Sequence, residues 1–243
     1  MIRDRTPEPQ TDSRREPMPI LAIDTCGPTG SVALARLTND ALEIISQTEL
    51  EGRNYSATLV AAVANLLTNA KIQLDQLTAI VAVNGPGSFT GVRVGLSAVK
   101  GLAEARQIPV VAVSRLEVLA WKAQSQSSAL DAHRHEVFLR LTTPGLGPKE
   151  LLAGPDELAA LDPLNTSIAV CDEAAAALLQ TAWPAAHQIR VEAPTAADAL
   201  KLCAPRVTVR DFADLALLDG HYLRRSDAEI FGAASKAAKP QSA

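Results

Sequence analysis

The spacing of hydrophobic positions changes several times in the first half of the chain. Short apolar runs bounded by turn residues indicate strands, and apolar residues at three- and four-residue spacing indicate helices. The predicted elements are strands at residues 20–24, 31–35, 42–50, 79–83 and 109–113 and helices at residues 56–71 and 90–105. A meander of three strands followed by alternating helices and strands predicts a layered α/β structure.

The second half continues as another α/β unit. Residues 114–117 read Ser-Arg-Leu-Glu, the form of a capping box, so we expect a helix to begin there and run past Trp121. Beyond it the pattern predicts strands near residues 128–132, 136–142, 167–171 and 188–191 and helices near residues 156–161, 173–183 and 196–203. Pro205 is expected to end or kink the last helix. We place the domain boundary at the capping box, which gives lobes of residues 20–113 and 114–225.

Three glycines and a proline follow the strand at residues 79–83. Residues 84–93 read Asn-Gly-Pro-Gly-Ser-Phe-Thr-Gly-Val-Arg. Glycines at a strand-to-helix junction let backbone amides converge on an anion, but they also form rigid corners. Their spacing fits neither the dinucleotide fingerprint nor the phosphate loop with its lysine. From these residues we favour a structural turn, and a bound nucleotide stays the alternative.

Composition and charge narrow the classes of function. The 243 residues are 47% hydrophobic and 21% charged, as in ordinary globular proteins. A formal net charge of −4 argues against a stand-alone nucleic-acid binder, which usually carries a basic stripe. The three widely spaced cysteines form no metal or redox pair, so we expect free thiols in a reducing cytoplasm. We expect no membrane span, a disordered extension at residues 1–19 and a tail at residues 226–243.

Four segments carry a family resemblance in the order in which they occur along the chain. They are residues 20–25 with 31–34, residues 85–103, residues 130–138 and residues 222–224. The most specific is Gly-Pro-Gly-Ser-Phe-Thr-Gly-Val-Arg-Val-Gly-Leu-Ser-Ala-Val-Lys-Gly-Leu-Ala at residues 85–103. Together they resemble the bacterial TsaB family, the partner subunit in biosynthesis of threonylcarbamoyladenosine on tRNA. The likeness covers residues 19–225 and implies an actin-like ATPase fold, the sugar kinase, heat-shock and actin fold, with two α/β lobes.

This resemblance implies a cytoplasmic, non-catalytic subunit of the complex that transfers a threonylcarbamoyl group to N6 of an adenosine in tRNA. In that family the first two helices pair with the catalytic subunit TsaD, or with a second copy as a homodimer in isolation. The ATPase TsaE joins the complex, and tRNA is contacted only through the complex. No cofactor is required, and ATP binding is left open.

The alternative is an actin-like ATPase or small-molecule kinase that uses Asp24 and the loop of residues 85–91. Peptidase activity is rejected, because a serine nucleophile needs a nearby base and nothing predicts one for Ser88 or Thr90.

Two sets of candidate site residues follow. The nucleotide-loop set is Asp24, Thr25, Gly85, Gly87, Ser88, Thr90, Gly91 and Arg93. Asp24 ends the first strand, where actin-like ATPases keep a carboxylate near the metal, but we favour a carboxylate that accepts hydrogen bonds from turn amides. The partner-interface set is Leu59, Val63, Leu66, Gly91, Val94, Gly95, Ala98 and Leu102. Small residues on helix 90–105 would admit a second helix, although both helices could instead only cover their own sheet.

No metal site is expected. TsaD binds a metal through two histidines four apart on a helix, whereas the matching segment here begins Asn54-Tyr55-Ser56 and contains no histidine. His133 and His135 could share one face of a strand, but this pair lacks a third ligand. Tyr55, His133 and His135 depart from the common TsaB pattern, so roles attached to those side chains do not carry over.

Overall fold

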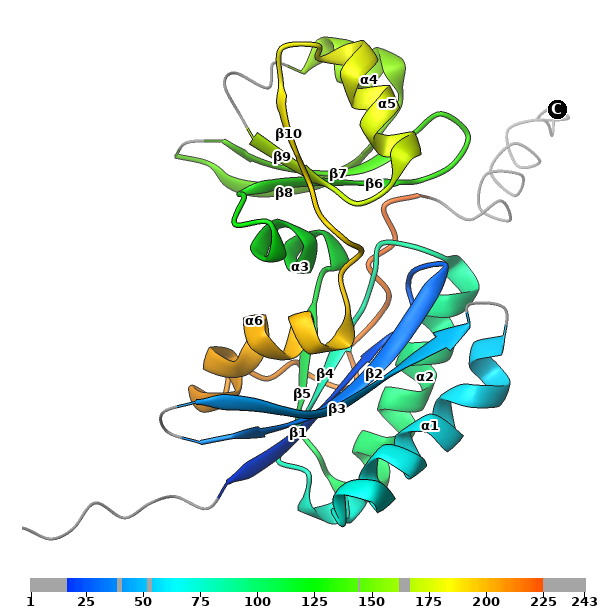
Figure 1. The fold of residues 1–243 in the computed structure, drawn as a ribbon, viewed down its shortest axis with the longest axis vertical. Helices are drawn as coiled ribbons and strands as arrows, with labels where there is room; N and C mark the ends of the chain where they lie inside the picture. The colour runs from blue at the N-terminus through cyan, green and yellow to red at the C-terminus, as the bar shows by residue number, and fades with distance from the viewer. Residues whose placement is uncertain (1–16, 39–40, 52–53, 144, 162–166, 225–243) are drawn as a thin grey trace, which may run out of the picture.

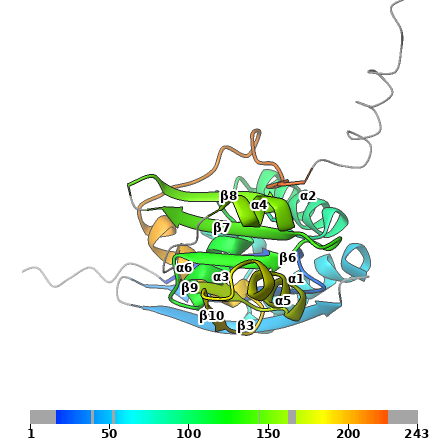
Figure 2. The same ribbon diagram turned by 90° about the horizontal axis from the view of Figure 1, so that it is seen from above.

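The chain folds around two five-stranded sheets that lie one above the other (Figure 1; seen from above in Figure 2). The computed structural model describes residues 17–38, 41–51, 54–143, 145–161 and 167–224. The predicted extension at residues 1–19 lies outside the described residues apart from its last three, and the predicted tail at residues 226–243 lies wholly outside them.

The first sheet has the strand order β3-β2-β1-β4-β5. Its strands are β1 (Met18–Asp24), β2 (Thr29–Leu37), β3 (Leu42–Glu51), β4 (Ala79–Val83) and β5 (Val110–Val113). The first three form an antiparallel meander, and β4 and β5 run parallel to β1. The helices α1 (Tyr55–Ala70) and α2 (Phe89–Arg106) cover one face of this sheet (Figure 1). A short helix, η2 (Leu74–Gln76), precedes β4.

The second sheet repeats this topology. Its order is β10-β9-β6-β7-β8, with β7 and β8 antiparallel to their neighbours and β9 and β10 parallel to β6. Its strands are β6 (Ser127–Asp131), β7 (Val137–Thr143), β8 (Gly147–Ala153), β9 (Ser167–Val170) and β10 (His187–Arg190). The helices α4 (Pro155–Ala160) and α5 (Glu173–Ala182) cover its outer face. Two copies of one mixed α/β unit make up the actin-like ATPase fold, so the predicted fold class is confirmed.

Two helices lie between the sheets, and each packs on a sheet other than that of the strand it directly follows. Helix α3 (Arg115–Lys122) follows β5 but packs on the second sheet. Helix α6 (Ala196–Thr208) follows β10 but packs on the first sheet, and it also contacts α3 (Figure 1). The boundary at residue 114 stays a prediction, but the buried residues of α6 belong to the core of the first sheet.

The core explains why the central strands are apolar on both faces. Helices cover both sides of β1 and β4, so Ile20, Leu21, Ile80 and Val81 have no exposed surface. Strands buried on both faces lose the alternation of apolar and polar residues that marks half-buried strands. This continuous apolar pattern is the signal from which both strands could be predicted.

Two details of the second half differ from the sequence-based expectation. Strand β8 was not expected, because Gly147, Pro148 and two charged residues begin it; such residues are tolerated there because β8 is an edge strand. Helix α6 does not end at Pro205 but continues to Thr208. Val207 is 3% exposed in the first core, so tertiary packing stabilises the turn that contains the proline.

Among the described residues, no helix has both the length and the apolar character that crossing a membrane requires.

Candidate functional site at the glycine loop

The glycine loop joins β4 to α2 and packs against the turn that follows β1. The amide of Ser88 donates to the carbonyl of Cys26 at 2.8 Å, and the hydroxyl of Thr25 donates to the carbonyl of Gly91 at 2.7 Å. A Cβ atom on Gly91 would lie 2.1 Å from the carbonyl oxygen of Thr25, so only glycine permits this approach. A Cβ atom on Gly87 would likewise lie 2.2 Å from the carbonyl oxygen of Cys26. The loop is therefore fixed to the β1–β2 turn by close backbone packing.

Two amides of the glycine loop, those of Ser88 and Gly91, are engaged within the chain. Ser88 caps helix α2, because its hydroxyl accepts the amide of Gly91 at 3.3 Å. Gly85 has a φ of +114°, which places its carbonyl to accept the amide of Arg115 at 2.6 Å. Thr90 is exposed, and Arg93 stacks 4.1 Å above the ring of Phe89. Nucleotide binding by this set of residues stays a prediction.

Asp24 is paired with a buried arginine. Its Oδ1 accepts the amide of Cys26 at 2.8 Å, and its Oδ2 lies 3.2 Å from Nε of Arg115. Asp24 is 1% exposed and Arg115 is 5% exposed. Burial alone would lower the pKa of Arg115, but the charge of Asp24 outweighs it and raises that pKa above its usual value. A cation from the chain thus stands beside the carboxylate where a phosphoryl-transfer enzyme would need a metal.

The surroundings of this pair are closed. The hydroxyl of Tyr55 donates to the carbonyl of Gly27 at 2.8 Å, and the thiol of Cys26 donates to the carbonyl of Val83 at 3.3 Å. Burial, with a further contribution from Asp24, raises the pKa of Tyr55 to about 12 and the pKa of Cys26 well above its usual value. Both side chains are therefore neutral donors at physiological pH.

Arg115 and Tyr55 take part in this cluster, yet the sequence does not predict them as site residues. Arg115 stands in the chain only as the second residue of a capping box, 91 positions from Asp24. Tyr55 stands out only as a departure from the family pattern. The contacts of Arg115 and Tyr55 could not be predicted from a local pattern, because each joins segments that meet only in the folded chain.

The predicted interface residues divide between the interior and its edge. Leu59, Val63 and Leu66 are at most 3% exposed and pack in the core under α1. A Cβ atom on Gly95 would lie 2.2 Å from Oγ1 of Thr25, so Gly95 faces the end of β1. Gly91 faces the same turn. These five residues are corrected from a partner surface to internal packing, because the three α1 residues lie in the core and the two α2 glycines face the turn that follows β1.

The remaining predicted interface residues lie at the edge of the core. Val94, Ala98 and Leu102 are half-buried and pack against the core cluster of the first sheet.

The outer face of α1 was not predicted as a surface of interest. Its exposed residues Ala57, Val60, Ala61 and Ala64 repeat at helical spacing, and Val60 is 62% exposed. No charged residue occurs between Tyr55 and Ala70. Surface helices usually carry charges on the solvent side, so an exposed helix of sixteen residues without any is unusual.

The two central histidines do not lie on a strand. His133 and His135 occupy the turn between β6 and β7, where residues 133–135 have φ angles of 59°, 56° and 60°. Nδ1 of His133 lies 2.8 Å from Oδ2 of Asp131. The expectation that both could share a strand face is therefore wrong, because Ala132 and Glu136 close a tight turn between them. Among the described residues, no group of three or more histidine, cysteine, aspartate and glutamate side chains is placed to hold a metal ion.

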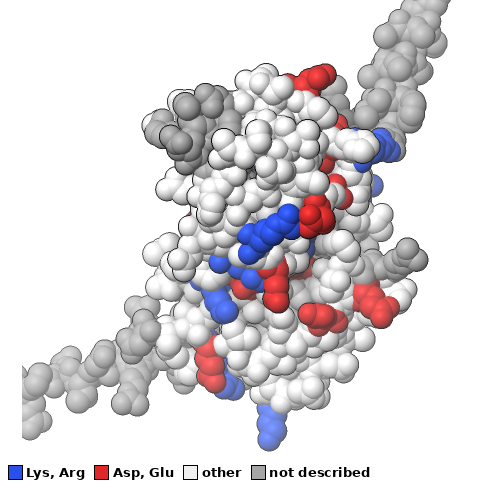
Figure 3. Space-filling view, turned by 45° about the horizontal axis from the view of Figure 1, so that its top comes forward, with Lys and Arg blue, Asp and Glu red and all other residues white. Residues whose placement is uncertain are grey.

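Charged side chains of both signs are mixed on the face drawn in Figure 3. In the part of the chain that the structure describes, this face shows no continuous basic surface.

Fold and site together define a two-lobed actin-like protein in which an internal arginine neutralises the carboxylate at the end of β1. Residues 41–141 match the family TsaD, described as tRNA N6-adenosine threonylcarbamoyltransferase. The chain is 38% identical over 128 residues to the tRNA threonylcarbamoyladenosine biosynthesis protein TsaB of Bacillus subtilis, covering 51% of this chain and 55% of that protein. It is 35% identical over 127 residues to TsaB of Escherichia coli, covering 50% and 53%.

A solved structure extends the likeness over both lobes. YeaZ from Pseudomonas aeruginosa is 26% identical, with a TM-score of 0.67 over 85% of this chain and 100% of that one. The sequence match spans about half the length of the two curated relatives. These similarities support the resemblance to the TsaB family that the glycine segment predicts.

Proposed function

We propose that this chain is a non-catalytic subunit of the machinery that makes threonylcarbamoyladenosine on tRNA, and that it binds and stabilises a TsaD-like catalytic subunit through α1 and α2. The two curated relatives are named for threonylcarbamoyladenosine biosynthesis on tRNA, which supports a role of this chain in the same process. The observation that carries the docking role is the uncharged outer face of α1.

The docking face is the exposed stripe of Ala57, Val60, Ala61 and Ala64, bordered by the half-buried edge of α2. Small side chains on this stripe let a partner helix approach closely, and the lack of charge on α1 removes the cost of desolvating ions. A partner that binds only the folded, competent catalytic subunit raises its population by mass action. A TsaE-like ATPase joins the complex, tRNA is contacted through the complex, and the isolated chain pairs with a second copy.

The contacts of Asp24 support a non-catalytic role. Both of its oxygens are engaged, one by the amide of Cys26 and the other by Arg115. A metal-bound triphosphate would have to displace a buried guanidinium before it could use this carboxylate. Titration calorimetry with ATP and magnesium tests this step. Tight binding with hydrolysis that is lost in Asp24→Ala would favour the ATPase or kinase alternative.

Val60→Lys tests the docking face. The side chain is largely exposed, so the monomer should keep its melting temperature, while a buried lysine at a contact should weaken pairing with the TsaD-like subunit at least about tenfold. Val209→Lys is the matched control, since Val209 is 73% exposed and lies at the end of α6, on the opposite side of the first sheet from α1.

Analytical ultracentrifugation measures the pairing, and assay of the modification on purified tRNA measures its consequence. If Val60→Lys pairs and supports modification as well as Val209→Lys does, the outer face of α1 is not the docking surface.

A further inference from the structure

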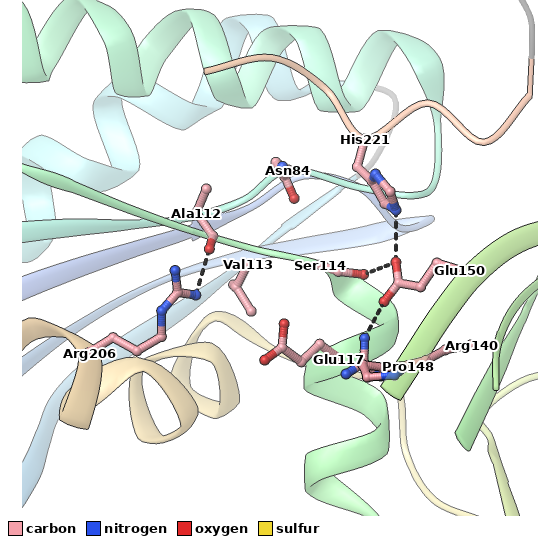
Figure 4. A pocket seen from close by; sticks show the side chains of 10 residues that line it. All are labelled: Asn84, Ala112, Val113, Ser114, Glu117, Arg140, Pro148, Glu150, Arg206 and His221. Carbon is pink, nitrogen blue, oxygen red and sulfur yellow. Dashed lines mark hydrogen bonds and ion pairs between the residues drawn. The ribbon is translucent and has the colours of Figure 1, made fainter. Parts of the chain in front are cut away.

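A cavity of about 440 Å³ lies between the two lobes (Figure 4), and none of its lining residues belongs to α1. Residues from both lobes line it. Asn84 follows β4, Ser114 and Glu117 begin α3, and Arg206 lies on α6, while Arg140 and Glu150 come from β7 and β8 and His221 from the segment after α6. Ligands of open α/β sheets bind outside the carboxyl ends of parallel strands, and the ends of β4 and β5 form one wall here.

Glu150 organises the far wall of the cavity. Its Oε1 accepts from Nη1 of Arg140 at 2.7 Å, and its Oε2 accepts the hydroxyl of Ser114 at 2.7 Å and lies 2.8 Å from Nε2 of His221. Burial alone would raise the pKa of Glu150, but these hydrogen bonds outweigh it and lower that pKa. The carboxylate is therefore ionised and already committed to its partners.

Glu117 has a different position. Its half-buried carboxylate points from α3 toward the side of the cavity where Arg206 lies (Figure 4). It makes no hydrogen bond or ion pair with any described residue, although its charge is close enough to raise the pKa of Arg206 together with Asp211. In the described chain this carboxylate is available to a ligand.

The two arginines in the lining keep part of their hydrogen-bonding capacity. Arg206 uses Nε for Asp211 and Nη1 for the carbonyl of Ala112, and Arg140 uses Nη1 for Glu150. The Nη2 groups of both arginines make no hydrogen bond to a described residue. A guanidinium with one free edge still accepts a carboxylate oxygen as a charge-assisted partner.

The charge of the lining selects the class of ligand. Two arginines balance Glu117 and Glu150, and Asp211 adds a further negative charge behind Arg206. A phosphate or nucleotide would find no excess positive charge. A ligand with one ammonium and one carboxylate matches both the unpaired Glu117 and the spare guanidinium edges.

We propose that this interlobe cavity binds a free α-amino acid, with the ammonium on Glu117 and the carboxylate on a spare Nη2 group of one of the two lining arginines, Arg206 or Arg140. The volume exceeds that of the shared backbone atoms and leaves room for a side chain and water. Because the lining comes from both lobes, the bound molecule bridges them. This inference does not depend on the docking role, since the cavity and the α1 face are separate surfaces.

Titration calorimetry on the full chain tests the proposal. The probes are the L-amino acids, each up to about 10 mM, with N-acetyl and methyl-ester derivatives of any that bind, and inorganic phosphate as the competing chemistry. We expect saturable binding of at least one amino acid. Blocking either charged end should weaken binding about tenfold or more, because each end forms a charge-assisted hydrogen bond.

Glu117→Gln should weaken binding of the same amino acid about tenfold while leaving the melting temperature unchanged. Glu104→Gln, an exposed glutamate on α2, is the matched control and should bind as the wild type does. If Glu117→Gln does not fold, the N-acetyl derivative titrated into the wild type decides the same point. Absence of binding by every amino acid, binding indifferent to Glu117 and to N-acetylation, or binding of phosphate alone would each overturn the assignment.

Discussion

The buried pair of Asp24 and Arg115 makes a sharp prediction about stability. Asp24→Asn keeps the acceptor for the amide of Cys26 but removes the charge that stabilises Arg115. The side chains of the pair are only 2% and 6% exposed, and Nη2 of Arg115 already lacks a partner among the described residues. The variant therefore leaves an uncompensated guanidinium in the interior.

Breaking a buried ion pair by removing one partner costs about 3 to 5 kcal/mol. For a chain of this size each kcal/mol lowers the melting temperature by about 2 to 4 °C, so Asp24→Asn should melt about 6 to 20 °C below the wild type. The double variant Asp24→Asn with Arg115→Met removes the unpaired charge as well and should recover most of that loss.

Differential scanning calorimetry of the two variants and the wild type measures these effects. Glu173→Gln supplies the control, because Glu173 and Arg190 form an ion pair on the exposed surface and its loss should leave the melting temperature unchanged within error. An Asp24→Asn variant as stable as the wild type, or a double variant less stable than the single one, would show that the pair does not stabilise the junction of the lobes.

Two further predictions concern the cavity and helix α2. Because the pKa of Glu150 is lowered in the folded chain, its contribution to stability is fully present above its usual value of 4.5 and is lost as the pH falls through the folded value. Acid unfolding followed by circular dichroism should therefore be less steep for Glu150→Gln than for the wild type, and identical slopes would contradict this. Gly95→Ala should cost about 1 to 3 kcal/mol in urea unfolding, because its Cβ would lie 2.2 Å from Oγ1 of Thr25. Gly101→Ala meets nothing within 4 Å and should stabilise the helix by about 0.5 to 1 kcal/mol; equal effects at both glycines would refute the packing described here.

The sequence by itself determined the elements of the first sheet and the class of fold. The strand at residues 79–83 and the glycine loop after it could be read directly, because a strand buried on both faces is continuously apolar and a strand-to-helix corner needs glycine. Ser114 marked the start of α3 for a similar reason, since a cap is a contact between neighbours in the chain. Such features depend on residues a few positions apart.

Tertiary structure alone decided what those elements face. Whether Gly95 faces the end of β1 or a partner helix depends on what packs against it, and helical spacing is the same in both cases. The pairing of Asp24 with Arg115 and of Glu150 with His221 joins positions 91 and 71 residues apart. The crossing of α3 and α6 between the sheets brings these distant segments together, and no local pattern encodes a contact that exists only once both lobes have folded.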